Sequence, residues 1–281
     1  MGRFDRYRAL NEGETNKPSW PMAIGWAIGF FSTLPAGPPQ VRNPHARDVF
    51  SFLFVGVMFA VIWSAVATLM LVIPNEEVGT LITAAGVMSI DILLTGGMHA
   101  DGLADVADGL AAKRSGSDVK RAMEDSAVGA VGGAYLVVAY IVRFALLTAA
   151  IYAMAPFGAT VLMIGLAPLV GRGLAGMALR SVAPSEGGLS DPLRSVIPFN
   201  GALLMLVITA ALGVGAANLL HFPLLMVLAI MGIATASALY LINRVSKTLD
   251  GIGGGDICGT GIVVAEAMVC LGLALSGPYL Y

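Results

Sequence analysis

The run FSFLFVGVMFAVIWSAVATLMLVI, residues 50–73, contains neither a charged side chain nor a proline. A helix needs about 20 predominantly apolar residues to cross a hydrocarbon core of about 30 Å. This run is long enough for one crossing, and a helix would satisfy all of its backbone polar groups internally. The run therefore predicts a transmembrane helix, and similar runs elsewhere in the chain predict the fold class.

Six further apolar runs approach or reach that length, at residues 79–94, 127–154, 159–179, 201–217, 223–242 and 261–276. Another run, WPMAIGWAIGFFSTL at residues 20–34, is shorter and ends in a proline-rich segment. Its tryptophans favour the membrane surface, which is typical of an interfacial or re-entrant helix. We therefore predict an all-α, polytopic integral membrane protein with about seven transmembrane helices plus this short N-terminal helix.

The composition agrees with a membrane protein. Of the 281 residues, 57% are hydrophobic and 12% are charged, and the mean hydropathy is +0.82. A soluble globular domain is excluded, and long apolar runs favour helices over the alternating strands of a barrel. The formal net charge of -2 predicts no nucleic-acid partner. Cys258 and Cys270 have the spacing of neither a zinc site nor a disulfide framework.

The basic residues predict the orientation, because cytoplasmic loops collect Lys and Arg. All except Arg143 and Arg172 lie before the first predicted span or after the second, fourth and sixth spans, whereas the alternate loops contain none. This pattern predicts a cytoplasmic N-terminus, an external C-terminus, and cytoplasmic positions for residues 95–126 and 243–260. Residues 1–19 are expected to be a polar cytoplasmic segment without a cleaved signal peptide. Residues 20–281 are expected to form a single membrane-embedded domain.

Three aspartates follow the second predicted span, in TGGMHADGLADVADGL at residues 95–110. If this stretch is helical, Asp101, Asp105 and Asp108 lie at i, i+4 and i+7 and share one face within about 60° of arc. Like charges on one face repel, whereas such oxygen donors suit a hard cation such as Mg²⁺. The alternative is a solvated acidic face. His99 falls on the opposite side of the same helix, where a surface or interface histidine is the simpler expectation.

The basic residues Lys113, Arg114, Lys120 and Arg121 follow these aspartates. They suit a substrate phosphate, but they equally suit a role in topology and contact with anionic membrane lipid.

Two further segments are candidates for phosphate contact. Asp125 and Ser126 precede a glycine-containing helix start, which either exposes backbone N–H groups to an anion or is simply capped by these side chains. In LDGIGGGDICGTG, residues 249–261, Gly254 and Gly255 precede Asp256. The glycines permit close backbone approach to a phosphate or metal, or form a flexible linker. The segment lacks the G-K-[ST] of a P-loop.

Ionisable residues within apolar runs are also functional candidates, because charges inside a membrane are costly. Arg143 needs a partner inside the helix bundle, and Asp91 or Glu266 could supply it. Arg172 is expected near the end of a span, where its long side chain could reach the interface.

Residues 95–109 have the sequence TGGMHADGLADVADG. This stretch resembles the hallmark T-G-G-x-H-x-D-G-L-A-D-x-x-D-G of the cobalamin synthase family, adenosylcobinamide-GDP ribazoletransferase. Other segments are similar and occur in the same order. They are FFSTLP at 30–35, EDSAVG at 124–129, PSEGGL at 184–189 and GIGGGDICG at 251–259. The resemblance thus covers nearly the whole chain. Most of the departures from the family pattern lose a basic residue. Thr33, Glu124 and Ala127 stand where the family usually carries a cation, and Gly255 replaces a threonine.

The resemblance implies a catalytic domain for late vitamin B12 assembly. The implied reaction is Mg²⁺-dependent transfer of the adenosylcobinamide phosphoryl group from adenosylcobinamide-GDP to α-ribazole, or to α-ribazole 5′-phosphate, releasing GMP. It implies Asp101, Asp105, Asp108 and Asp256 as Mg²⁺ ligands. Asp256 is alternatively a base for the attacking hydroxyl, and His99 is a weaker candidate for the base. We expect contacts with membrane lipid, a bacterial inner-membrane location and active-site loops on the cytoplasmic side.

Two other functions compete with this interpretation. A CDP-alcohol phosphotransferase also carries Asp and Gly at the cytoplasmic ends of spans, but its D-x-x-D-G-x-x-A-R pattern has an arginine that is missing here. A cation- or proton-coupled transporter could use Asp91, the aspartates and Arg143. However, transporter sites tend to lie near the bilayer midplane, whereas these acids gather at one predicted membrane face.

Overall fold

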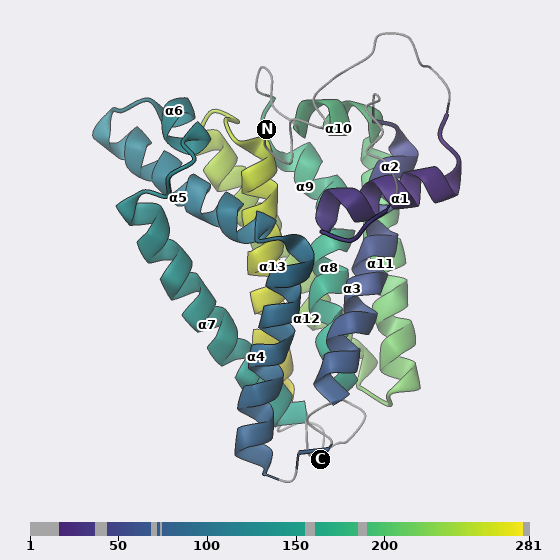
Figure 1. Cartoon of the computed structure of the whole chain (residues 1–281). Coiled ribbons are helices and arrows are strands. Elements are labelled where there is room, and N and C mark those ends of the chain that lie inside the picture. The colour runs from purple at the N-terminus through teal and green to yellow at the C-terminus, as the bar shows by residue number, and fades with distance from the viewer. Residues whose placement is uncertain are drawn as a thin grey trace.

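A computed structural model describes residues 17–36, 44–68, 72–73, 75–154, 161–184 and 190–277. Within these ranges the chain is helical and contains no strand (Figure 1). The helices are α1 (Trp20–Phe31), α2 (Ala46–Phe50), α3 (Phe52–Ala67), α4 (Glu76–Thr95), α5 (Met98–Ser115), α6 (Val119–Glu124), α7 (Ala130–Met154), α8 (Leu166–Gly173), α9 (Ala175–Ser181), α10 (Ser190–Val196), α11 (Phe199–Leu219), α12 (Leu224–Thr248) and α13 (Gly254–Ser276). Most of the predicted N-terminal segment, residues 1–16, lies outside the described residues.

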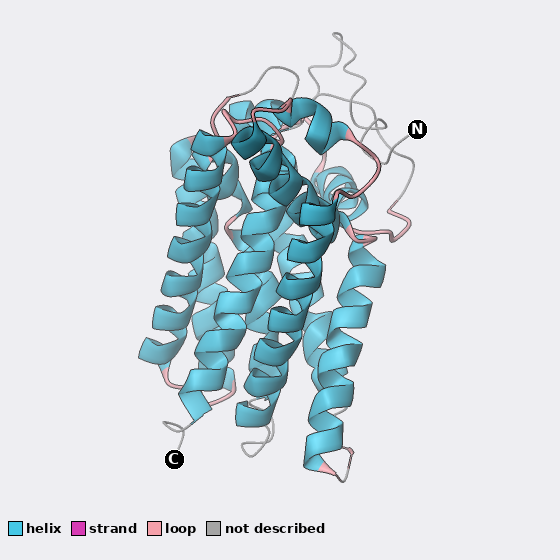
Figure 2. Ribbon diagram, turned by 90° about the vertical axis from the view of Figure 1, so that its left-hand side faces the viewer, coloured by secondary structure: helices cyan, strands magenta, loops and turns pink. Residues whose placement is uncertain are grey.

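Seven stretches are long and apolar enough to cross a membrane, and they lie roughly parallel in one bundle (Figure 2). Each coincides with one of the seven predicted spans. They are Ala46–Ala67, Glu76–Thr95, Ala130–Met154, Val161–Ser181, Phe199–Leu219, Leu224–Thr248 and Gly254–Ser276. The predicted polytopic, all-α class is therefore confirmed.

The N-terminal helix α1 has only 12 residues and lies across the bundle instead of along it (Figure 1). It is too short to cross a hydrocarbon core as a helix. Its inner face stacks against α3, where Phe31 meets Phe52 edge to face at a ring-centroid distance of 4.7 Å. This packing fixes α1 at the end of the bundle that also carries α5 and α6.

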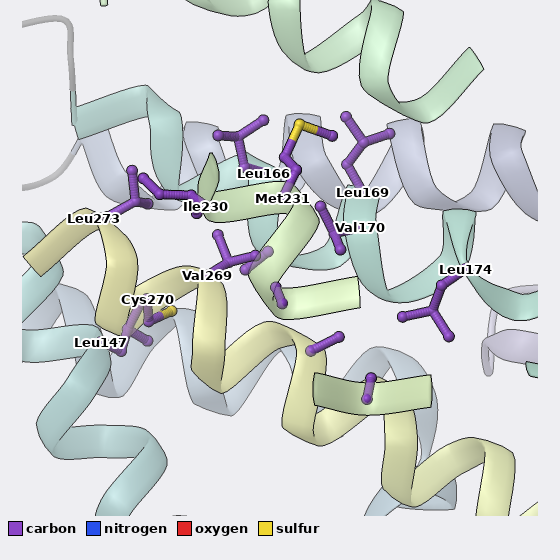
Figure 3. Packing of buried hydrophobic residues seen from close by; sticks show 14 of the residues in the cluster. Leu147, Leu166, Leu169, Val170, Leu174, Ile230, Met231, Val269, Cys270 and Leu273 are labelled. Atoms are coloured by element: carbon purple, nitrogen blue, oxygen red, sulfur yellow. The ribbon is translucent and has the colours of Figure 1, made fainter. Parts of the chain in front are cut away.

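The fourth span, Val161–Ser181, forms the centre of the bundle. In its most apolar window 89% of positions are buried, against 22% in α7, which lies at the periphery. The span is not one regular helix, because α8 ends at Gly173 and α9 restarts at Ala175. Side chains of α7, α8, α12 and α13 interdigitate around it, among them Leu147, Val170 and Met231 (Figure 3).

Inside this apolar core, Asp91, Arg143, Arg172 and Glu266 form an ion-pair cluster, and none of the four side chains is more than 2% exposed. Arg143 Nη2 donates to Asp91 Oδ2 at 2.9 Å and to Glu266 Oε2 at 2.5 Å. Arg172 pairs with the same two carboxylates. Two positive charges therefore balance two negative ones, and α4, α7, α8 and α13 are joined.

The cluster answers two expectations from the sequence. Arg143 takes both of its possible partners. The expectation that Arg172 reaches the interface is wrong, because its side chain is 0% exposed and its guanidinium lies 4.4 Å from the Phe59 ring centroid. A charge this deep in a bundle is costly unless it is paired, so the two acids hold Arg172 inside.

Candidate functional site

The joint between α4 and α5 is made by Thr95, Gly96 and Gly97. Both glycines have left-handed backbones, with φ of 62° and 76°. Glycine adopts this conformation without the steric cost that a side chain adds. Thr95 Oγ1 donates at 2.8 Å to the Asp91 carbonyl, one turn earlier in α4. The joint lets the chain leave α4 and begin α5 in a new direction.

The aspartates follow on α5, which is helical as their spacing required. Asp101 is exposed, whereas Asp105 and Asp108 are partly buried. Asp256, in the first turn of α13, lies beside them because Gly102 has no side chain. A Cβ on Gly102 would lie 3.0 Å from Asp256 Cα. The structure thus brings the four predicted acids together, and we call them the acid cluster.

The carboxylates of the acid cluster repel one another. Burial, followed by repulsion from the other three carboxylates, raises the pKa of Asp105 to about 7. Among the described residues, no Lys, Arg or His forms an ion pair with Asp101, Asp105 or Asp256. Crowded carboxylates without a cationic partner have the charge and donor type that suit Mg²⁺.

Asp108 differs from the other acids because both of its oxygens are already engaged. Oδ2 accepts from the Gly129 backbone N–H and Oδ1 from that of Gly132, each at 2.8 Å. A Cβ on Gly132 would lie 2.3 Å from Asp108 Oδ2, so this contact requires glycine. Asp108 therefore caps the N-terminus of α7 from α5, where its negative charge is favourable.

The predicted Mg²⁺ site agrees with the chemistry of the acid cluster but not with the present positions of its side chains. Within the part of the chain that the structure describes, no three side chains of the types His, Cys, Asp and Glu are arranged to enclose one metal ion. The chemistry of the acid cluster fits a hard cation, while the present side-chain positions do not surround one.

His99 lies on the opposite side of α5, as its position in the helix predicted. The expectation of a surface or interface histidine is wrong, because His99 is 2% exposed and its ring is 6.2 Å from that of Phe31. Burial, followed by the positive charge of Arg172, lowers the pKa of His99 to about 3, so the imidazole is neutral. Neither ring nitrogen has a hydrogen-bond partner among the described residues. The charges that act on His99 belong to the ion-pair cluster and not to the acid cluster.

The basic candidates have separate surroundings. Lys113 Nζ pairs with Asp250 Oδ2 at 2.7 Å and so ties α5 to the turn before α13. Lys120 approaches Glu124 at 3.9 Å on α6. Arg114 and Arg121 are exposed and form no ion pair within the described ranges.

The segment between α6 and α7 shows a local turn in place of an open anion site. Asp125 Oδ1 accepts from the Ala127 backbone N–H at 3.0 Å, and Ser126 is exposed. A hollow of about 420 Å³ adjoins it, lined by Asp118, Lys120, Arg121, Glu124 and Asp125.

The residues that stand where the family usually carries a basic side chain make local contacts in this structure. Thr33 Oγ1 donates to the Leu93 carbonyl at 2.9 Å, so Thr33 fastens the segment after α1 to the end of α4. Glu124 faces Lys120, and Ala127 completes the turn with Asp125. PSEGGL falls mostly outside the described residues, since only its proline belongs to them.

The start of α13 reveals a residue that sequence reasoning missed. The Ser190 hydroxyl lies against Gly254, 2.2 Å from where a Cβ would stand. It is buried and has no hydrogen-bond partner among the described residues. Gly255 has open space at the same helix end. The available signal was that Ser190 directly follows PSEGGL, at residues 184–189.

Comparison with known proteins shows which family the chain belongs to. A relative from Stutzerimonas stutzeri (strain A1501), named adenosylcobinamide-GDP ribazoletransferase, is 30% identical over 264 residues, or 91% of this chain and 98% of the relative. A protein of the same name from Pseudomonas fluorescens is 31% identical over 256 residues, or 89% and 97% of the two chains. No solved structure matches. The sequence profile of cobalamin-5-phosphate synthase matches residues 23–274, and the chain belongs to this family.

Proposed function

We propose that the protein is an adenosylcobinamide-GDP ribazoletransferase of late cobalamin synthesis. Its relatives carry that name and are matched over nearly their full length. The observation that carries the proposal is the acid cluster, in which α5 and the first turn of α13 present mutually repelling carboxylates side by side.

In the proposed reaction, the 5′-hydroxyl oxygen of α-ribazole attacks the phosphorus attached to adenosylcobinamide. The bond from this phosphorus to the oxygen that bridges it to GMP breaks, and GMP leaves with the electron pair. The proton of the hydroxyl passes to a carboxylate of the acid cluster. α-Ribazole 5′-phosphate would react in the same way and give the phosphorylated product.

Asp101, Asp105 and Asp256 are the proposed ligands of Mg²⁺, which would neutralise charge on the diphosphate. Their side chains would rotate toward one another when a cation relieves their repulsion. Asp108 is better suited to holding α7 against α5, because its two oxygens already accept backbone N–H groups. His99 is not proposed as the base, because it lies on the other side of α5.

The diphosphate would lie between the acid cluster and the first turn of α13. The backbone N–H groups of Gly254 and Gly255 have no helical partner there and favour an anion. Ser190 adds a buried hydroxyl that contacts Gly254. The bundle end that bears this site also bears the Lys- and Arg-rich helices α5 and α6. We therefore propose that it faces the cytoplasm of a bacterial inner membrane.

The test is product formation by the purified protein from adenosylcobinamide-GDP and α-ribazole, with and without Mg²⁺. We expect cobalamin and GMP only with Mg²⁺, and at least a hundredfold loss in Asp101→Ala with insertion and folding retained. Wild-type turnover by Asp101→Ala would contradict the metal proposal. Ion flux in liposomes without any product would favour a transporter instead.

A further inference from the structure

A groove lies between α5 and α7. Its volume is about 340 Å³. Its apolar lining is Ala107, Leu110 and Ala111 from α5, together with Val131 and Tyr135 from α7. Arg114 and Ser115, in the last turn of α5, form its polar end. The groove therefore combines an apolar floor with a cation and a hydroxyl at one end.

The apolar lining continues down α7 as an exposed stripe. Val131, Tyr135, Val138 and Val142 are between 40% and 61% exposed. They stand at i, i+4, i+7 and i+11, so they share one face of the helix. Eleven residues of helix rise about 16 Å. This length is close to half of a hydrocarbon core of about 30 Å, which is the depth of one leaflet.

The charge at the polar end is available to a ligand. Within the described residues Arg114 has no acidic partner, whereas its neighbour Lys113 is paired with Asp250. A guanidinium binds a phosphate oxygen pair through a fork of N–H donors. Ser115 lies beside it, and its hydroxyl oxygen is within 2.9 Å of that of Ser117.

We infer that this groove is a binding site for one anionic phospholipid, with its phosphate on Arg114 and one acyl chain along the α7 stripe. The occupant is an amphiphile because the polar end and the apolar stripe are continuous. It is anionic because Arg114, which is exposed and has no acidic partner in the part of the chain that the structure describes, brings a positive charge to the polar end. A soluble nucleotide would leave the stripe below Tyr135 unused. The inference does not depend on the proposed reaction.

The binding test uses native mass spectrometry of the purified full-length protein with phosphatidylglycerol or phosphatidylcholine. The wild type should retain phosphatidylglycerol preferentially. One basic residue near a membrane surface changes lipid affinity about fivefold, so Arg114→Gln should lower this retention by about that factor. The matched control is Arg244→Gln. Arg244 is an exposed arginine near the C-terminal end of α12 and does not line the groove, so this variant should retain phosphatidylglycerol as the wild type does.

A second variant tests the acyl-chain path. Ala111→Phe fills the groove and leaves Arg114 in place, so it should also lose phosphatidylglycerol while its melting temperature in lipid-free detergent stays near that of the wild type. Equal retention of both lipids by the wild type would overturn the inference, as would full retention by either groove variant. Displacement of the lipid by GDP at equal concentration would overturn it in favour of a soluble phosphate ligand.

Discussion

Asp105 is repelled by each of the other three carboxylates of the acid cluster. Its pKa is raised to about 7 by burial first and then by the neighbouring carboxylates. Below pH 7 the metal-free site therefore keeps a proton on Asp105, and above pH 7 the carboxylate is free. A cation must displace this proton, so binding is linked to pH.

We predict that the Mg²⁺ concentration for half-maximal activity rises as the pH falls from 8 to 6, by up to about tenfold per pH unit below the pKa. Initial rates measured over a Mg²⁺ series at pH 6, 7 and 8 would show this. A half-saturating concentration that is independent of pH would contradict the assignment of Asp105 as a ligand.

Replacing Asp108 should affect stability and not Mg²⁺ binding, in contrast to Asp105. Asp108→Asn removes the negative charge at the start of α7 and one of two accepting oxygens, which should cost about 1–2 kcal/mol of stability. We expect a lower melting temperature and a lower kcat, but the same Mg²⁺ half-saturation as the wild type.

The matched control is Asp118→Asn, because Asp118 caps α6 by accepting from the Arg121 backbone N–H at 3.1 Å. Asparagine caps helices as well as aspartate does, so this variant should be near neutral. A large shift of Mg²⁺ half-saturation in Asp108→Asn would show that Asp108 is itself a metal ligand.

The sequence predicted the shared acid face, because i, i+4 and i+7 spacing follows from helix geometry alone. It did not predict that Asp108 faces α7, since that depends on where α7 begins in space. Ser190 was missed for the same reason: its position after PSEGGL is a local signal, but its contact with the start of α13 depends on how α10 and α13 pack.

At the scale of elements, the ion-pair cluster holds α8 and α13 together through Arg172 and Glu266. Removing one partner of a buried ion pair leaves a charge without compensation and costs about 3–5 kcal/mol. Arg172→Met and Glu266→Met should therefore each destabilise strongly. The double variant keeps the Arg143–Asp91 pair and overall neutrality, so it should lose clearly less than the sum of the two single losses.

Thermal unfolding in detergent measures these effects, with exposed Arg244→Met as the control for loss of an arginine. Additive losses in the double variant would contradict the account that charge balance, and not the individual contacts, keeps the cluster stable.

Apolar runs in the sequence predict where helices lie, but they do not predict which helices supply the partners of a buried charge. The sequence predicted the fourth span as one run, and the structure has one span there, in which Leu174 joins α8 to α9 with a helical backbone. The position of Arg172 within this span was misjudged, because its partners come from α4 and α13, which are distant in the chain.

At the scale of the whole molecule, bilayer thickness made the seven spans predictable. The end of α13 at Ser276 and the helices α1, α5 and α6 lie at opposite ends of the bundle (Figure 1). This separation agrees with an odd number of crossings. Which end faces the cytoplasm remains a prediction from the Lys and Arg distribution.

Cysteine labelling tests the orientation. Glu76 begins α4 and Thr95 ends it beside α5, so Glu76 lies at the end of the bundle away from the acid cluster. In a background with Cys258 and Cys270 replaced by alanine, Glu76→Cys should react with a membrane-impermeant maleimide added to intact cells. Glu124→Cys should react only after permeabilisation. The reverse pattern would invert the proposed topology.

The central claim is that α5 and α13 share one cation. Mn²⁺ can stand in for Mg²⁺, and its free concentration is measured by electron paramagnetic resonance in the presence of the purified protein and adenosylcobinamide-GDP. The account predicts a single tight Mn²⁺ site in the wild type that is weakened at least tenfold in both Asp105→Asn on α5 and Asp256→Asn on α13. Wild-type Mn²⁺ affinity in either variant would contradict it.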